Sequence, residues 1–167
     1  MFESMYSMRN GKVLTIEALA DSTVFPNPYA IYASGFWKCS EEIILKTEES
    51  LQFRLPGQLR SYYAEIGVGT VRGHDDAISF SFNNVLIPTH IPELINGTCG
   101  WMAPYTQIEP EVVPFFERDV DLFFCIKPKS ANPNAVHWMW GEKICDSLNE
   151  FFNRIAGDPS WPNPSGF

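Results

Sequence analysis

The chain has 167 residues, of which 45% are apolar and 14% aromatic, so it can bury a sizeable core and is not expected to be disordered. Twelve Lys and Arg against twenty Asp and Glu give a formal net charge of −8, which disfavours direct binding to nucleic acid or to anionic lipid. The opening MFESMYSMRN lacks the apolar run of a secretory leader, and no apolar run reaches the length of a bilayer. We therefore expect a cytoplasmic protein.

The chain divides into three parts by composition. Residues 1–38 combine short apolar pieces with the turn-forming sequence FPNPY, and they predict an irregular or strand-containing N-terminal extension packed on the domain. Residues 39–157 are expected to form a single domain. Residues 158–167 are rich in Pro and predict an extended C-terminal tail.

Two helices are predicted at the start of this domain. Ser40 is a good N-cap for the first, and two acidic residues follow it where the helix dipole favours negative charge. Pro56 suits the first turn of the second helix, and Gly67 can adopt the left-handed conformation that ends it. The buried face of the second helix is predicted by helical spacing to contain Leu59, Tyr62, Tyr63 and Ile66.

A third helix is predicted near the end of the chain. Ser147 and Glu150 have the spacing of a capping box, and Gly157 marks the C-terminal end. The apolar face of this helix is expected to consist of Leu148, Phe151, Phe152 and Ile155.

The middle of the chain predicts strands. Four segments are rich in β-branched and aromatic residues, and they are AISFSFNNVLIP, EVVPFFERD, DVDLFFCIKP and AVHWMWGEKI. A short helical turn is expected in THIPELINGT. The order helix, helix, strands, helix predicts an α+β fold, with a mostly antiparallel central sheet on which the two N-terminal-side helices and the C-terminal helix pack.

Alternation along AVHWMWGEKI suggests which side chains of that segment share a face. Trp138 and Trp140 would lie on one face and His137 and Met139 on the other. We expect both tryptophans to belong to the core.

Residues with catalytic or metal-binding potential do not form a convincing site. The four cysteines have no CxxC pair, which argues against zinc and favours reduced, mostly buried thiols. The sequence His74-Asp75-Asp76 could belong to a metal-dependent hydrolase, but consecutive loop residues are more typical of a solvated acidic turn. We expect no catalytic residues, no metal and no cofactor.

Four segments, in order, resemble the SUKH superfamily of Smi/Knr-like domains. EEIILKTEESLQFRLPGQLRSYYAEIGVGTV is similar to its acidic helix, Leu-Pro, aromatic helix and glycine turn. NVLIPTHIPELI, VPFFERDVDLFFCIKPK and ICDSLNEFFNRI resemble its strand with a short helix, its strand–acidic turn–strand portion and its closing helix. The resemblance covers about residues 39–157 and implies a binding role, since bacterial members are associated with immunity to toxins.

A candidate binding surface combines aromatic and acidic side chains. Trp101 and Tyr105 lie in a Pro-containing loop and have the character of interface anchors, although they could instead close the core beneath that loop. Acidic residues follow them along the chain, and they are Glu109, Glu111, Glu117, Asp119 and Asp121. Spaced two apart in an extended chain, the members of each of the pairs 109/111 and 119/121 would project to the same side, as in a charged rim around a binding site.

The resemblance thus implies an immunity protein that neutralises a cognate toxin by direct contact. The acidic balance favours a basic partner, plausibly a nuclease, with no direct contact to nucleic acid or membrane. The alternative is a regulatory scaffold of the same fold that binds a protein other than a toxin. Reversing the charge of Asp119 and Asp121 together is expected to weaken partner binding.

Overall fold

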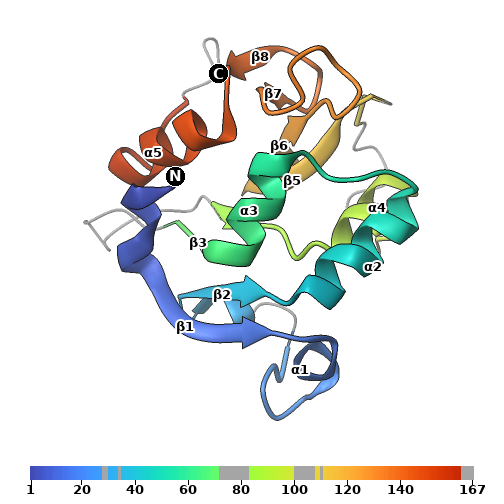
Figure 1. Cartoon of the computed structure of the whole chain (residues 1–167), viewed down its shortest axis with the longest axis vertical. Coiled ribbons are helices and arrows are strands. Elements are labelled where there is room, and N and C mark those ends of the chain that lie inside the picture. Colours follow the sequence, from blue (N-terminus) through green and yellow to red (C-terminus); the bar gives the residue numbers. More distant parts are fainter. Residues whose placement is uncertain (28–29, 34, 72–82, 100–107, 110, 163–167) are drawn as a thin grey trace.

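A computed structural model describes residues 1–27, 30–33, 35–71, 83–99, 108–109 and 111–162 (Figure 1). Its helices are η1 (Glu3–Met8), α1 (Ile16–Ala20), η2 (Ala30–Ala33), α2 (Glu41–Leu51), α3 (Gly57–Glu65), α4 (His90–Ile95) and α5 (Leu148–Gly157). Its strands are β1 (Arg9–Leu14), β2 (Phe36–Cys39), β3 (Gly69–Thr70), β4 (Asn84–Val85), β5 (Val113–Asp119), β6 (Leu122–Ile126), β7 (Val136–Trp138) and β8 (Lys143–Cys145). No helix in these ranges is long and apolar enough to cross a membrane.

The strands form a six-stranded antiparallel sheet in the order β3-β4-β5-β6-β7-β8 and a separate parallel pair, β1-β2. The two sheets are connected by a bridge between Trp37 and Val68, whose backbone groups exchange two hydrogen bonds of 2.8 Å. The predicted α+β class and the antiparallel central sheet are confirmed.

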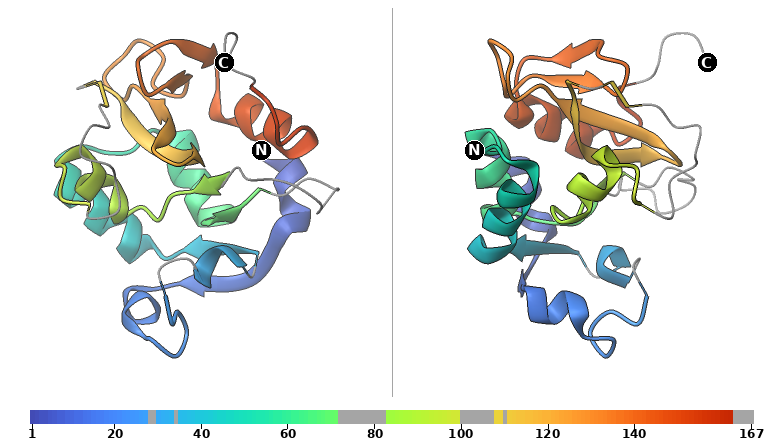
Figure 2. Two further views of the ribbon diagram at one scale, coloured as in Figure 1. Left: turned by 180° about the vertical axis from the view of Figure 1, so that it is seen from behind. Right: turned by 90° about the vertical axis from the view of Figure 1, so that its right-hand side faces the viewer.

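Helices α3 and α5 cover the same face of the central strands (Figures 1 and 2). The Tyr62 ring of α3 stacks on the Phe152 ring of α5, with centroids 3.6 Å apart. The Tyr62, Tyr63 and Phe152 side chains are fully buried, and so are the other residues expected on these helix faces. The helical spacing in the sequence therefore predicted both buried faces.

Strand β5 supplies the sheet side of this aromatic core. A register shift between Pro114 and Phe116 interrupts the alternation of β5, so that Phe115 and Phe116 both pack on Phe151 of α5, at 5.5 and 5.3 Å. Burial of each such ring contributes about 1.5–3 kcal/mol to folding.

The predicted helix caps are present. The Ser40 hydroxyl accepts a hydrogen bond from Ile43 N, and the Ser147 hydroxyl accepts one from Glu150 N at 3.0 Å. The return bond of the capping box is displaced by one residue, because Glu150 Oε2 accepts from Asp146 N. Pro56 is the N-cap of α3 and lies just before its first turn.

Gly67 connects α3 to the sheet, as expected for a left-handed residue. Its φ is +96°, and a Cβ atom at this position would lie 1.7 Å from the carbonyl oxygen of Trp37. Only glycine allows α3 to end this close to β2.

Two of the predicted strands differ in the structure. The segment 135–144 forms two strands, β7 and β8, because the chain turns at Gly141, which has a φ of +94°. In the segment 77–88 the described strand is limited to β4, and residues 77–82 lie outside the described ranges.

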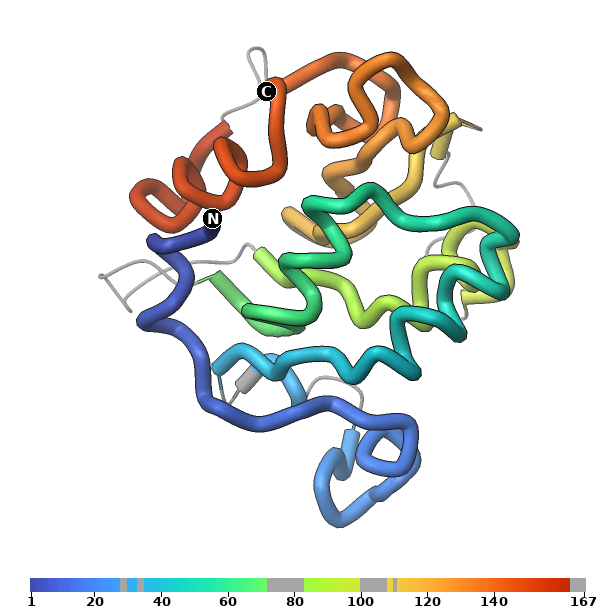
Figure 3. Tube along the Cα trace, viewed as in Figure 1, coloured from blue at the N-terminus to red at the C-terminus, as the bar shows by residue number. Residues whose placement is uncertain are grey.

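The N-terminal segment shares the main core. Figure 3 shows it running from beside α5 to β1, which pairs with β2. The Phe2 ring lies edge-on to Tyr62 and Phe152, and Phe2 N donates to Asn149 Oδ1 at 2.8 Å.

The start of the C-terminal tail also packs on the domain. The Trp161 ring contacts Phe151, and the guanidinium of Arg118 donates to the carbonyl oxygens of Pro159 and Ser160. Strand β5 and the residues after α5 are therefore tied together.

Candidate functional site

The acidic residues expected at the binding surface flank the β5–β6 hairpin. Asp119 pairs with Leu122 at the turn of this hairpin, whereas Val113 pairs with Ile126 at its other end. Glu109 and Glu111 precede Val113, so the two acidic pairs lie at opposite ends of the hairpin, about 20 Å apart. Trp101 and Tyr105 lie outside the described residues, so the structure does not place the predicted aromatic anchors.

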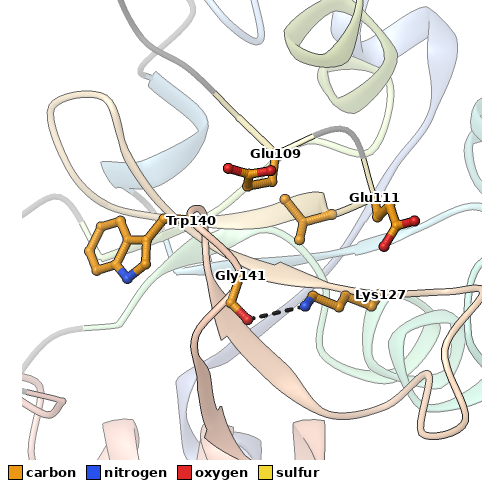
Figure 4. Close-up of a pocket in the computed structure, with 6 residues that line it drawn as sticks. Glu109, Glu111, Lys127, Trp140 and Gly141 are labelled. Carbon is orange, nitrogen blue, oxygen red and sulfur yellow. Dashed lines mark hydrogen bonds between the residues drawn. The ribbon is translucent and has the colours of Figure 1, made fainter.

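Glu109 and Glu111 line an open pocket of about 430 Å³, shown in Figure 4. Its other lining residues are Val112, Lys127, Trp140 and Gly141. We call these six residues the pocket surface. Both residues of the predicted acidic pair 109/111 therefore line one pocket.

Trp140 belongs to this surface and not to the core. It lies in the turn between β7 and β8, where Gly141 N donates to Trp138 O and Trp138 N donates to Glu142 O, both at 2.8 Å. Gly141 takes the left-handed position that such a turn requires. The expectation that Trp140 is buried was wrong because alternation applies to a strand, and its side chain is 42% exposed in this turn.

The Trp140 ring is held by Trp138. The two rings are parallel within 8°, with centroids 4.9 Å apart, and Trp138 is buried against Phe124. Trp140 Nε1 also donates to the exposed carboxylate of Glu142 at 3.2 Å. The exposed ring is therefore oriented before any partner arrives.

Backbone hydrogen bonds fix Glu109 beside this turn. Glu109 N donates to Met139 O, and Val112 N donates to Glu109 O, each at 3.2 Å. Both Glu109 and Glu111 are exposed. Their carboxylates are thus attached to a positioned chain and remain in contact with solvent.

Lys127 and His137 meet at the carbonyl oxygen of Gly141. Lys127 Nζ donates to this oxygen at 3.1 Å, and His137 Nδ1 lies 3.2 Å from it. Burial lowers the pKa of His137, and the nearby Lys127 and Lys143 lower it further. His137 and Lys127 therefore both lie against the backbone of this turn.

The opposite end of the hairpin forms a second acidic surface, which we call the turn surface and define as Asp119, Val120 and Asp121. Val120 is 67% exposed, and its N–H donates to Asp119 Oδ1 at 2.8 Å. Asp121 has a φ of +56°. The chain here is a tight turn, so the spacing rule for an extended pair does not apply to these two residues.

Glu117 lies below the turn surface and is buried. Its side chain is 9% exposed and pairs across the sheet with Asn84 of β4. Its pKa is raised to about 7, mainly by burial and in part by the charges of Asp121 and Asp119, while a hydrogen bond with the Asn84 side chain lowers it. This carboxyl is not part of an exposed rim.

The described residues offer little for catalysis. They contain no group of three or more His, Cys, Asp or Glu side chains arranged to hold a metal ion. Burial raises the pKa of the Cys39 and Cys125 thiols, and that of Cys145 to about 11, which suppresses the nucleophilic thiolate. The cluster His74, Asp75 and Asp76 falls outside the described residues.

Comparison with known proteins gives the family. Residues 38–154 match the model of the SMI1/KNR4 family (SUKH-1). The chain is also similar to the immunity protein YxxD of Bacillus subtilis (strain 168), with 26% identity over 127 residues, which cover 73% of this chain and 83% of that protein. The family match spans most of the chain and includes both ends of the β5–β6 hairpin. The protein therefore belongs to the SMI1/KNR4 family (SUKH-1).

Proposed function

We propose that this protein is an immunity protein that binds a cognate toxin and neutralises it by direct contact. The observation that carries this proposal is the similarity to an immunity protein over most of both chains. The exposed Trp140 beside Glu109 and Glu111 is consistent with it, because protein interfaces are rich in aromatic anchors surrounded by polar groups.

The toxin that we propose for this surface is a basic protein, such as a nuclease. The net charge of −8 would speed the encounter with a positively charged nucleic-acid groove, and it would repel the nucleic acid itself. By covering that groove in the cytoplasm, the protein would inhibit the toxin without any catalysis of its own.

The test is to co-express the chain, carrying a removable tag, with the product of the neighbouring gene. We expect a stoichiometric complex and rescue of growth from the neighbour's toxicity. A chain truncated before α5, which lacks part of the core, is the matched control and should neither bind nor rescue. A harmless neighbour that does not co-purify would contradict the proposal and favour the regulatory scaffold.

A further inference from the structure

We propose that the pocket surface accepts an arginine side chain of the protein partner, with the guanidinium stacked on Trp140 and bonded to the carboxylate of Glu109, while Glu111 adds negative charge at the other side of the pocket. This inference rests on the proposed function for the identity of the partner. The chemistry of the pocket itself can be tested without that partner.

The first argument is the exposed, supported indole. Large aromatic side chains are normally buried, but Trp140 is 42% exposed. One face of its ring stacks on the buried Trp138, and the other face is left for a ligand. A cation placed over an indole is attracted by its ring electrons, and arginine does this most often because its planar group stacks. Since Trp138 already fixes the Trp140 ring, little side-chain entropy would be lost on binding.

The second argument is the charge of the pocket. The lining of the pocket contains two carboxylates, Glu109 and Glu111, and one ammonium, that of Lys127, so one negative charge is in excess for an incoming cation. Glu109 lies on the Trp140 side of the pocket and Glu111 on the Lys127 side (Figure 4). Lys127 Nζ is directed to the Gly141 carbonyl oxygen, as Figure 4 shows. Glu142 adds a further carboxylate at the Trp140 indole nitrogen.

The third argument is size and geometry. A pocket of about 430 Å³ is large enough for a guanidinium and its three-carbon stem, and Val112 provides an apolar lining residue for that stem. A guanidinium donates in a planar fork that matches carboxylates, whereas a lysine ammonium is a compact, strongly hydrated charge that gains less from stacking. Acidic side chains alone are typical of a solvated surface. The oriented Trp140 ring in the pocket is the feature that favours arginine.

The experiment is a nuclear magnetic resonance titration with the small probe N-acetyl-arginine-N-methylamide. The chain has five tryptophans, so the indole N–H signal of Trp140 is assigned by its loss in Trp140→Phe. We expect this signal to shift saturably. The corresponding lysine amide should bind about threefold or more weakly, and the citrulline amide, which keeps the shape without the charge, should give no saturable shift.

Matched variants locate the effect. The double variant Glu109→Gln and Glu111→Gln keeps the shape of the pocket and should lower the affinity for the arginine probe about tenfold. The double variant Asp119→Asn and Asp121→Asn changes the net charge equally at the far end of the hairpin and should leave the affinity within about twofold. Neither pair is in the core, and an unchanged amide spectrum would verify the fold.

Three results would overturn the arginine pocket: a Trp140 signal that the arginine probe leaves in place, equal shifts with the citrulline probe, or unchanged affinity in the glutamine variant. These results are separable from the fate of the proposed function. If the protein forms a toxin complex but the arginine probe does not shift the Trp140 signal, the arginine pocket is refuted and the immunity role is retained. If the probe binds saturably but the protein protects against no toxin, the arginine pocket is supported and the proposed immunity role is refuted.

Discussion

The two ends of the β5–β6 hairpin carry similar acidic charge in different surroundings. At the pocket surface, Glu109 and Glu111 are exposed beside an oriented Trp140. At the other end, Asp119 and Asp121 border a tight turn above the buried carboxyl of Glu117. The first end keeps its carboxylates exposed, whereas the second brings three carboxyl groups close together and buries one of them.

The difference shows that acidic residues within one short stretch of sequence need not form one surface. The charge at the pocket surface can be compensated by a ligand, and it acts at short range. The charge at the turn surface raises the pKa of Glu117. If the partner binds at the pocket surface as proposed, the turn surface would act on it through the long-range field.

The largest expected effect is a loss of stability at Gly67, in the core structure that supports both ends of the hairpin. Gly67→Val would place a side chain against the backbone of Trp37 at a positive φ, which should lower the free energy of unfolding by at least about 2 kcal/mol. Denaturant titration measures this loss. Gly57→Ala is the control, because a Cβ at Gly57 meets nothing within 4 Å, and equal stability of the Gly67 variant and wild type would contradict the turn assignment.

The second effect is a pH dependence of stability that is expected from Glu117, near the turn surface, and not from the pocket surface. The pKa of Glu117 is about 7 in the folded protein against 4.5 for an ordinary glutamate, so the folded state binds this proton more tightly. Its stabilising contribution is complete below about pH 4.5 and is lost as the pH rises through about 7, with an upper bound of about 3 kcal/mol. Above pH 7, Glu117→Gln should therefore be more stable than wild type.

Unfolding of wild type and Glu117→Gln from pH 4.5 to 8.5 measures this difference. The lowered pKa values of His90 and His137 act in both proteins, so subtraction removes their contribution. The control Glu111→Gln removes a carboxylate that is exposed, so it should not reproduce the gain in stability above pH 7 that is expected for Glu117→Gln. A pH-independent difference between wild type and Glu117→Gln would show that Glu117 has an ordinary pKa.

The third effect concerns binding at the pocket surface. Trp140→Ala should weaken binding to the toxin partner about tenfold or more, mostly through faster dissociation, because short-range contacts are lost. Calorimetry or surface plasmon resonance measures it. Val120→Ala removes an even more exposed apolar side chain at the turn surface and should change the affinity less than about twofold, so a reversed order would assign the interface to the turn.

The smallest effect is expected from the charge at the turn surface. Reversing Asp119 and Asp121 to Lys should slow association several-fold at low salt and reduce its salt sensitivity, because the long-range field is weaker. Stopped-flow association over a range of salt concentrations measures this. Reversing the exposed Glu42 and Glu49 of α2 changes the net charge equally, and an identical effect there would mean that the position of the charge is irrelevant.

Local features of the fold were predictable from the sequence. The caps at Ser40 and Ser147 depend on residues within four positions, and the glycine at position 67 depends on the local end of α3. The buried faces of α3 and α5 follow from helical spacing alone. These elements were predicted because neighbouring residues in the sequence determine them.

The candidate site was predicted only in part. Glu109 and Glu111 were named, but Trp140 was assigned to the core, and Lys127 was missed. A local signal for Trp140 existed, since Gly141 follows it directly and a glycine can end a strand in a turn. The position of Glu109 beside that turn depends on a hydrogen bond to Met139, thirty residues further along the chain, which spacing cannot reveal.

The position of Phe2 has a consequence for synthesis of the protein. Its ring fills a fully buried place between α3 and α5, and its backbone N–H bonds to Asn149, 147 residues later. In a nascent chain, the Phe2 ring could not reach its buried position until the segment of α5 had left the ribosome. In a cell that makes a toxin at the same time, protection would begin only when almost all of these residues have been translated, so the two genes would have to be expressed with the immunity protein in advance or in excess.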